Sequence, residues 1–179
     1  MKARSVPLPD AALLGRYSPD TGSDCVGNYV DCFRAEFDGA VDLQSFVAAF
    51  YRTPLFRLER VILARAMKLA STDEGAIALS EGRTQAFAAW SVEARTADQL
   101  LMCAVDRRTR SWFMVRPSSN GTVLYFGSAV LPPPDGQSDR PFANWLYRAA
   151  LPLHRVYSVL LLGAAHRKLA RDRSDKRAQ

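Results

Sequence analysis

Residues 86–131 decide the fold: AFAAWSVEARTADQLLMCAVDRRTRSWFMVRPSSNGTVLYFGSAVL. Apolar and polar residues alternate along this stretch, which is the period of a β-strand with one buried face. Turn-forming residues interrupt the alternation three times, and the links are short enough for hairpins. The stretch therefore predicts a four-stranded antiparallel meander, with strands at 86–95, 100–105, 109–116 and 122–131.

The same links predict which residues share a face of this sheet. One face carries no charge, and its largest side chains are those of Trp90, Met102, Phe113 and Tyr125. An antiparallel sheet with one solvated side turns its apolar face to the core, so we expect this face to be the inner one. A slip of one residue would bring charged side chains into the core, so the register is strongly specified.

The opposite face of the meander is too apolar to be plain surface. It carries a contiguous patch of four large side chains: Trp112, Met114, Leu124 and Phe126. Patches of this kind mark contact surfaces. We expect the patch to be covered, either by a second subunit in a homodimer or by the N-terminal residues of the same chain.

Further elements flank the meander. Residues 29–37 (YVDCFRAEF) alternate as an additional strand, with Asp31 on the same face as Phe33 and Phe37. The spacing of apolar residues predicts short helices at about 42–51, 53–69 and 71–81.

The C-terminus predicts one long amphipathic helix. Its apolar residues include Leu153, Val156, Tyr157 and Leu160, which we expect to lie near one face. Pro152 should kink this helix or split it in two.

Together these elements predict an α+β fold. A curved antiparallel sheet, made of the N-terminal strand and the four-stranded meander, wraps around the long C-terminal helix, and two or three short helices follow the first strand. We expect residues 1–28 to form an irregular N-terminal arm, 29–170 a single domain and 171–179 a basic disordered tail.

The charge of the chain restricts the partners that it can have. The formal net charge of the 179 residues is +6, and residues 166–179 hold six Lys or Arg against two Asp. Positive charge gathered in a tail is unlike the clustered, folded surface that binds nucleic acid, so we expect no nucleic-acid partner. The tail leaves open a weak contact with an anionic membrane surface.

Neither an export signal nor a membrane span is expected. No apolar stretch approaches the ~18 residues that cross a bilayer, and the N-terminus MKARSVPLPDAALLG places prolines and an aspartate where a secretory signal has its apolar core. We therefore expect a cytoplasmic protein with reduced thiols.

The chain has no motif for a metal or a cofactor. Its cysteines, Cys25, Cys32 and Cys103, have neither zinc-pair nor CxxC spacing, and its two histidines, His154 and His166, form no HExxH. No phosphate-binding glycine loop or GxSxG elbow occurs. We expect neither metal nor cofactor.

The order of strand, helices, meander and long C-terminal helix resembles the helix-grip fold of the START-like superfamily, with a bacterial branch as the nearest likeness. The likeness is carried by YVDCFRAEF, the meander and two helical segments, TPLFRLERVIL (53–63) and LHRVYSVLLLGAAHRKL (153–169). START-like domains usually have two more strands before the meander, where this chain shows a short helix and a loop. The related nuclear-transport-factor-like α+β roll therefore also fits.

The resemblance implies a cavity between sheet and C-terminal helix that holds a small hydrophobic molecule. From the periodicity we expect Trp90, Met102, Phe113 and Tyr125 of the sheet to face Tyr157 of the helix. A solid core made of the same residues is the alternative, because periodicity reports burial and not empty space. Our leading hypothesis is binding or carrying of a small apolar ligand without catalysis.

An enzyme in the same scaffold is the second hypothesis. A metal-free cyclase, dehydratase or hydrolase would use Asp31 or His154 as acid or base. A carboxylate among aromatic side chains has a raised pKa and suits that role. The simpler interpretation is that Asp31 pairs with one of the many arginines.

Overall fold

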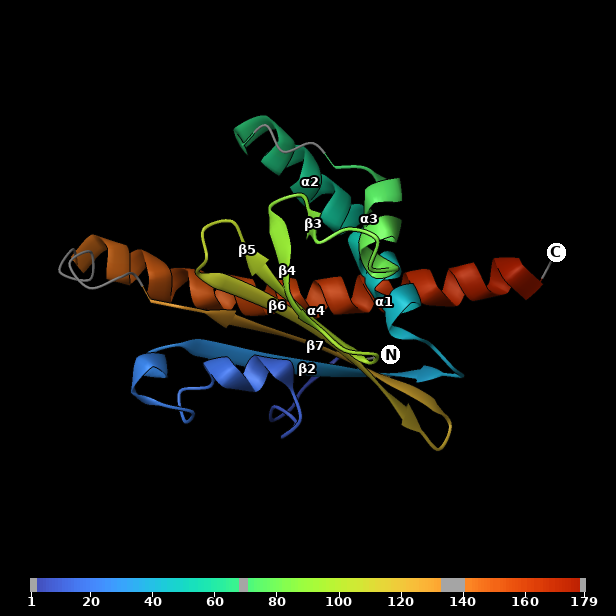
Figure 1. Cartoon of the computed structure of the whole chain (residues 1–179), viewed down its shortest axis with the longest axis horizontal. Coiled ribbons are helices and arrows are strands. Elements are labelled where there is room, and N and C mark those ends of the chain that lie inside the picture. The colour runs from blue at the N-terminus through green and yellow to red at the C-terminus, as the bar shows by residue number, and fades with distance from the viewer. Residues whose placement is uncertain (1–2, 68–70, 133–140, 178–179) are drawn as a thin grey trace.

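The computed structural model describes residues 3–67, 71–132 and 141–177, and it is an α+β fold (Figure 1). Its sheet is open and antiparallel, and the long N-terminal strand pairs with the last strand of the meander. Along the sheet the order is β1 (Arg4–Ser5), β2 (Tyr29–Asp38), β7 (Gly121–Val130), β6 (Thr109–Ser118), β5 (Gln99–Ala104), β4 (Trp90–Arg95) and β3 (Ala86–Phe87). The N-terminal strand and the four-stranded meander are thus confirmed, except that the predicted strand 86–95 is divided into β3 and β4, which pair with each other. Strand β1 is a short addition at the opposite edge.

The helices start where capping residues allow it. They are α1 (Leu43–Tyr51), α2 (Pro54–Met67), α3 (Asp73–Ser80) and α4 (Pro141–Arg177). The Asp42 carboxylate accepts from Ser45 N at 2.7 Å and caps α1, while Thr72 Oγ1 accepts from Gly75 N at 3.2 Å and caps α3. The three short helices between β2 and the meander are as predicted.

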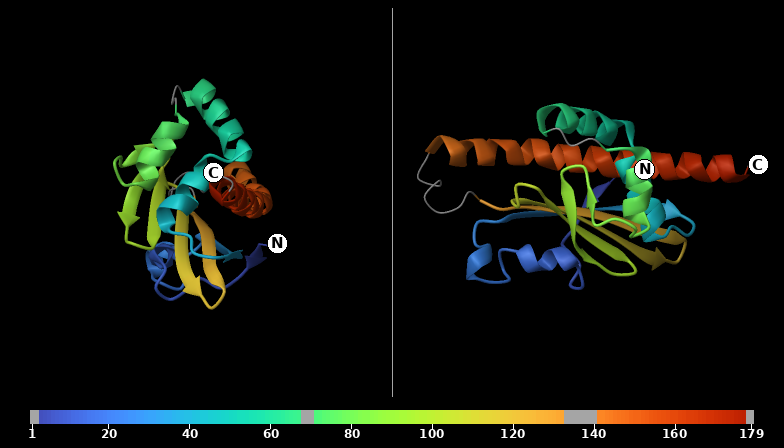
Figure 2. Two further views of the ribbon diagram at one scale, coloured as in Figure 1. Left: turned by 90° about the vertical axis from the view of Figure 1, so that its right-hand side faces the viewer. Right: turned by 45° about the horizontal axis from the view of Figure 1, so that its top comes forward.

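Helices α1 and α4 together cover the inner face of the sheet (Figure 2). The side chains of Phe46, Phe50 and Tyr51 in α1 pack against Phe113 of β6, and Phe50 also contacts Phe126 of β7. Aromatic rings at these separations prefer edge or tilted contacts, as observed here. Helix α1 therefore packs against the centre of the inner face, and α4 packs over β2 and β7.

Helix α4 is turned about its axis from the predicted orientation. Within residues 152–175, where burial is described, the buried residues are Ser158, Leu161, Leu162, Ala165 and Leu169. Leu153, Val156 and Leu160, expected to face the core, are exposed, Leu153 by 74%. The sequence pattern is apolar around more than half of the helix, so it does not single out the buried side.

Two features of α4 differ from the prediction. Pro152 lies inside the helix and does not split it in two, because the helix runs from Pro141 to Arg177; the other expected effect, a kink at Pro152, stays a prediction. The basic residues after 170 are helical and not a disordered tail. Lys168 Nζ lies 3.0 Å from Asp172 Oδ1, and the Arg173 guanidinium donates to the backbone carbonyl of Asp38, which holds this end of the helix to β2. Residues 178–179 lie outside the described chain.

The register of β7 corrects the predicted faces. Strands β6 and β7 meet in a two-residue turn, with Ser118 opposite Gly121, so Phe113 pairs with Phe126. Leu124 and Phe126 therefore lie on the inner face and Tyr125 on the outer one, the reverse of the prediction. A link counted one residue wrong turns over every side chain of the strand. The faces of β5 and β6 are as predicted.

The outer apolar face is covered by the N-terminal arm of the same chain. The arm contains two short 3-10 helices, η1 (Leu13–Tyr17) and η2 (Ser23–Cys25), and lies across the sheet opposite the helices (Figure 1). Leu14 packs into one cluster with Trp112 and Met114, and all three are fully buried.

The four residues predicted to form a homodimer surface therefore do not form an exposed patch. Trp112 and Met114 are buried under the arm, and Leu124 and Phe126 are buried in the inner core. None of the four is open to a second subunit. The other expectation, cover by the N-terminal residues, is confirmed for Trp112 and Met114 only.

Candidate functional site

A cavity of about 340 Å³ lies between the inner face of the sheet and helices α1, α2 and α4. Its volume falls near the lower end of the ~300–1,000 Å³ range of ligand sites. The lining residues are Phe50, Tyr51, Phe56, Glu59, Ala89, Trp90, Ala104, Val105, Asp106, Thr109, Ser111, Phe126, His154, Tyr157, Ser158 and Leu161. Val105 and Asp106, at the turn between β5 and β6, are the solvent-exposed members, so the cavity opens there.

Two of the five residues predicted to bind a ligand line this cavity, and three do not. Trp90 and Tyr157 are lining residues. Met102 and Phe113 lie on the same face of the sheet but are fully buried in the solid core beside the cavity. Tyr125 is on the opposite face of the sheet, packed near Trp112, because β7 is inverted relative to the prediction.

Glu59 of α2 is a cavity residue that the sequence analysis missed. The Tyr157 hydroxyl donates a hydrogen bond to its carboxylate. Burial raises the pKa of Glu59 and this hydrogen bond opposes the rise; burial also raises the pKa of Tyr157. In α2 Leu58 is 59% exposed and Phe56 is buried. No signal in α2 alone marks Glu59, since its partner is nearly a hundred residues away.

A buried hydrogen-bond chain joins Asp31 of β2, Ser128 of β7 and His154 of α4. Ser128 Oγ lies 2.6 Å from Asp31 Oδ1, and Ser128 N donates to the same oxygen at 3.0 Å. Tyr29 Oη donates to Asp31 Oδ2 at 3.1 Å. His154 Nε2 lies 2.8 Å from Ser128 Oγ. Asp31 thus accepts from hydroxyl and amide groups, and the expected pairing with an arginine is not what the structure shows.

The hydrogen bonds that join Asp31, Ser128 and His154 allow one self-consistent arrangement of protons when Asp31 is a carboxylate. Ser128 has a single hydroxyl proton, and the 2.6 Å separation places it toward Asp31. Ser128 Oγ must then accept from His154, so the imidazole carries its proton on Nε2. Burial lowers the pKa of His154, although the nearby Asp31 charge opposes this, so the neutral ring is favoured. The basic nitrogen is then Nδ1.

Trp90 lines the cavity, and its side chain carries an unsatisfied donor. Its Nε1 is shielded from water and has no hydrogen-bond partner among the described residues. A buried polar group of this kind calls for an explanation, because it costs about 1–3 kcal/mol when left unpaired.

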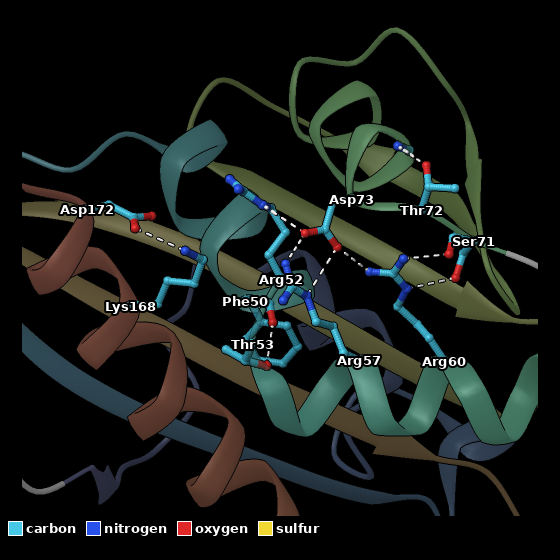
Figure 3. Close-up of polar contacts among 11 residues, drawn as sticks. Phe50, Arg52, Thr53, Arg57, Arg60, Ser71, Thr72, Asp73, Lys168 and Asp172 are labelled. Carbon is cyan, nitrogen blue, oxygen red and sulfur yellow. Dashed lines mark hydrogen bonds and ion pairs between the residues drawn. The ribbon is translucent and has the colours of Figure 1, made fainter. Parts of the chain in front are cut away.

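A second polar cluster lies away from the cavity and has a structural role (Figure 3). Asp73, at the start of α3, is surrounded by Arg52, Arg57 and Arg60. Partial burial opposes ionisation, but hydrogen bonds from Arg57 and Arg60 lower the pKa of Asp73 to about 2. Arg60 also donates to Ser71 Oγ at 2.9 Å, so the cluster ties α2 to α3.

Metal-binding and membrane-spanning features were also sought in the described ranges. There, no three His, Cys, Asp or Glu side chains are grouped so as to hold a metal ion. No helix of the described chain is long and apolar enough to cross a bilayer. Cys25, Cys32 and Cys103 are free thiols.

Comparison with known proteins finds no counterpart: no protein-family model, curated protein or solved structure matches this chain.

Proposed function

We propose that this protein binds a small hydrophobic molecule in the cavity between the sheet and helices α1, α2 and α4. The observation that carries the proposal is the cavity itself, about 340 Å³ and lined mainly by aromatic and aliphatic side chains. A few polar groups, Glu59, His154 and Tyr157, interrupt this lining. Ligand sites are typically apolar with a small number of polar groups that set orientation.

The resemblance to the START-like helix-grip fold is part of this proposal. It is supported by the pairing of β2 with β7 and by α4 lying across these two strands. The two-residue β3 stands where START-like domains usually have longer strands, which keeps the nuclear-transport-factor-like roll as the alternative. The proposed place of action is the cytoplasm, in keeping with three free thiols.

Fluorescence titration with N-phenyl-1-naphthylamine tests the proposal. This neutral aromatic amine brightens in apolar surroundings, and we expect saturable binding of one molecule per chain. Ala104→Phe places a ring in the cavity and should abolish binding while the far-UV spectrum is unchanged. Ala97→Phe, at an exposed turn position, is the matched control and should bind as the wild type does. Equal binding by Ala104→Phe, or none by the wild type, would refute the proposal.

A second candidate function, weak attachment to an anionic membrane surface, is favoured by one feature of α4. The exposed Leu153, Val156 and Leu160 share a helix face with the exposed Arg167 and Arg171. An apolar stripe followed by cations on one face is typical of helices that lie on anionic lipid.

Flotation with vesicles tests this second candidate. We expect partial flotation with phosphatidylserine vesicles at low salt and less flotation at high salt, because surface charges are screened. Leu153→Gln with Val156→Gln should abolish it. Absence of flotation at low salt removes the candidate.

A further inference from the structure

The hydrogen-bond chain from Asp31 through Ser128 reaches the cavity at His154. Ser128 is fully buried and Asp31 nearly so, and the His154 ring is a lining residue. The chain therefore runs from the buried interior of the sheet to the space that the proposed ligand occupies. On the cavity side this hydrogen-bond chain ends in the titratable imidazole of His154, and the hydrogen bond with Ser128 sets the orientation of that ring.

The same cavity wall holds a second polar pair. Tyr157 lies one helical turn after His154 on α4, and residues three apart on a helix are neighbours on its surface. The Tyr157 hydroxyl is bonded to Glu59 of α2. A ligand in the cavity would thus meet a base and, next to it, a hydroxyl–carboxyl pair.

We propose that His154 Nδ1 is a general base that removes a proton from the carbon next to a carbonyl group in the bound molecule, so that the protein enolises an apolar ketone or aldehyde. This inference rests on the proposed function, because it requires a ligand in the cavity. His154 is the catalytic residue, and Ser128 and Asp31 are positioning residues that act through it.

The step needs no further reactant. The carbon–hydrogen bond breaks, the proton bonds to Nδ1, and the electron pair moves through the new carbon–carbon double bond onto the carbonyl oxygen. The imidazolium that forms is stabilised by Asp31 through Ser128, as an oriented base requires. Return of the proton to carbon or oxygen gives the ketone or the enol and restores His154. A carbonyl is required because an ordinary carbon–hydrogen bond is far too weak an acid for imidazole.

Exchange of hydrogen for deuterium in 2-tetralone tests the proposal. This two-ring ketone has acidic hydrogens next to its carbonyl, and proton NMR in D2O reports both its binding and the loss of those signals. We expect the wild type to accelerate exchange about 100-fold over buffer, within the range of general base catalysis. His154→Gln should bind the ketone and leave exchange at the buffer rate. His166→Gln changes the chain's other histidine, outside the cavity, and should exchange like the wild type.

The positioning residues are tested by a signature that a merely structural role would not produce. Nitrogen-15 shifts should show His154 protonated on Nε2 in the wild type and mixed between the two nitrogens in Ser128→Ala, which should also exchange more slowly while still binding. A wild-type ring protonated on Nδ1 overturns the inference. Binding of 2-tetralone with exchange no faster than in His154→Gln also overturns it but leaves the proposed function standing. Absence of ketone binding also overturns the inference, and the proposed function then depends on the titration with N-phenyl-1-naphthylamine alone.

Discussion

The indole Nε1 of Trp112 donates to the side-chain oxygen of Gln99 at 2.8 Å, beneath the N-terminal arm. The same oxygen accepts from Leu13 N at 2.9 Å, and Gln99 Nε2 donates to Ala11 O at 2.9 Å. One buried amide thus ties the largest side chain of the outer sheet face to the backbone of the arm that covers it. This relationship explains why an arm rich in turn-forming residues holds a definite place.

Replacing Gln99 with leucine should therefore loosen the arm. The change leaves the Trp112 and Leu13 N–H groups and the Ala11 carbonyl buried without partners, and we expect a loss of about 3 kcal/mol in the free energy of unfolding. Urea denaturation measures the loss, and tryptophan emission should shift to longer wavelength. Gln44→Leu, at an exposed position of α1, should change stability by less than about 0.5 kcal/mol. Equal stability of the two variants would show that the amide does not hold the arm.

The fold was largely predictable because alternation and capping are local signals. Asp42 caps α1 and Thr72 caps α3, close to where the apolar spacing predicts that these helices begin. The faces of β7 were harder to predict, since the two-residue turn at Ser119 and Asn120 and the predicted five-residue link at 117–121 fit the sequence equally well. Pro117 sits inside β6, opposite Thr122 and beyond the last residue paired with β5, where its missing N–H faces no partner strand.

Acid should weaken the protein through His154. Burial lowers the pKa of this imidazole below its ordinary value of 6.5, so the unfolded chain binds the proton more readily. Its contribution to stability is then present above about pH 6.5 and is lost as pH falls through the lower, folded pKa. The free energy of unfolding, measured in urea at several pH values, should fall less steeply between about pH 7 and 5 in His154→Gln. If the free energy of unfolding depended on pH equally in the wild type and in His154→Gln, the buried environment of His154 would be contradicted.

The other histidine, His166, gives a separate test of the idea that buried histidines make the protein less stable in acid. Burial also lowers the pKa of this ring, whose Nε2 lies 3.1 Å from the Glu36 carbonyl. His166→Gln should remove its own share of the acid sensitivity. The two shares should add in the double variant, because the sites do not share partners.

Asp73 should make a contribution in a lower pH range. Its pKa of about 2 lies below the ordinary 3.8, so its stabilisation is present above about pH 4 and is lost as pH falls toward 2. Asp73→Asn should cost about 1–2 kcal/mol at neutral pH, since it weakens contacts with partly exposed arginines. Thermal unfolding at pH 7 and pH 3 measures both effects. Asp20→Asn, at an exposed position, should have neither, and a neutral result for Asp73→Asn would exclude the proposed tie between α2 and α3.

The candidate site was only partly predictable, for a physical reason. Trp90 and Tyr157 were found because periodicity reports which side chains are buried. Periodicity does not report where packing is incomplete, so Met102 and Phe113 looked equivalent to Trp90 although they fill the core. The pairing of Glu59 with Tyr157 and the meeting of Asp31, Ser128 and His154 depend on tertiary contacts across long stretches of chain.

Tyr157→Phe should change the titration of Glu59. The Tyr157 hydrogen bond opposes the rise in the Glu59 pKa that burial causes, so its removal should raise that pKa further. The variant should lose about 1–3 kcal/mol in stability, most at neutral pH, where the ionised carboxylate has lost its donor. Carbon-13 shifts of the Glu59 carboxyl follow the titration. Tyr125→Phe, on the other face of the sheet, should leave it unchanged, and a lowered Glu59 pKa in Tyr157→Phe would contradict the contact.

Intermolecular nuclear Overhauser effects from bound N-phenyl-1-naphthylamine test the central claim, the occupied cavity, most directly. The cavity predicts contacts from the probe to the methyl groups of Leu161 in α4 and of Val105 in the turn after β5, both of which line it. Contacts confined to Leu153, Val156 and Leu160 would place the probe on the exposed stripe of α4 and contradict the account.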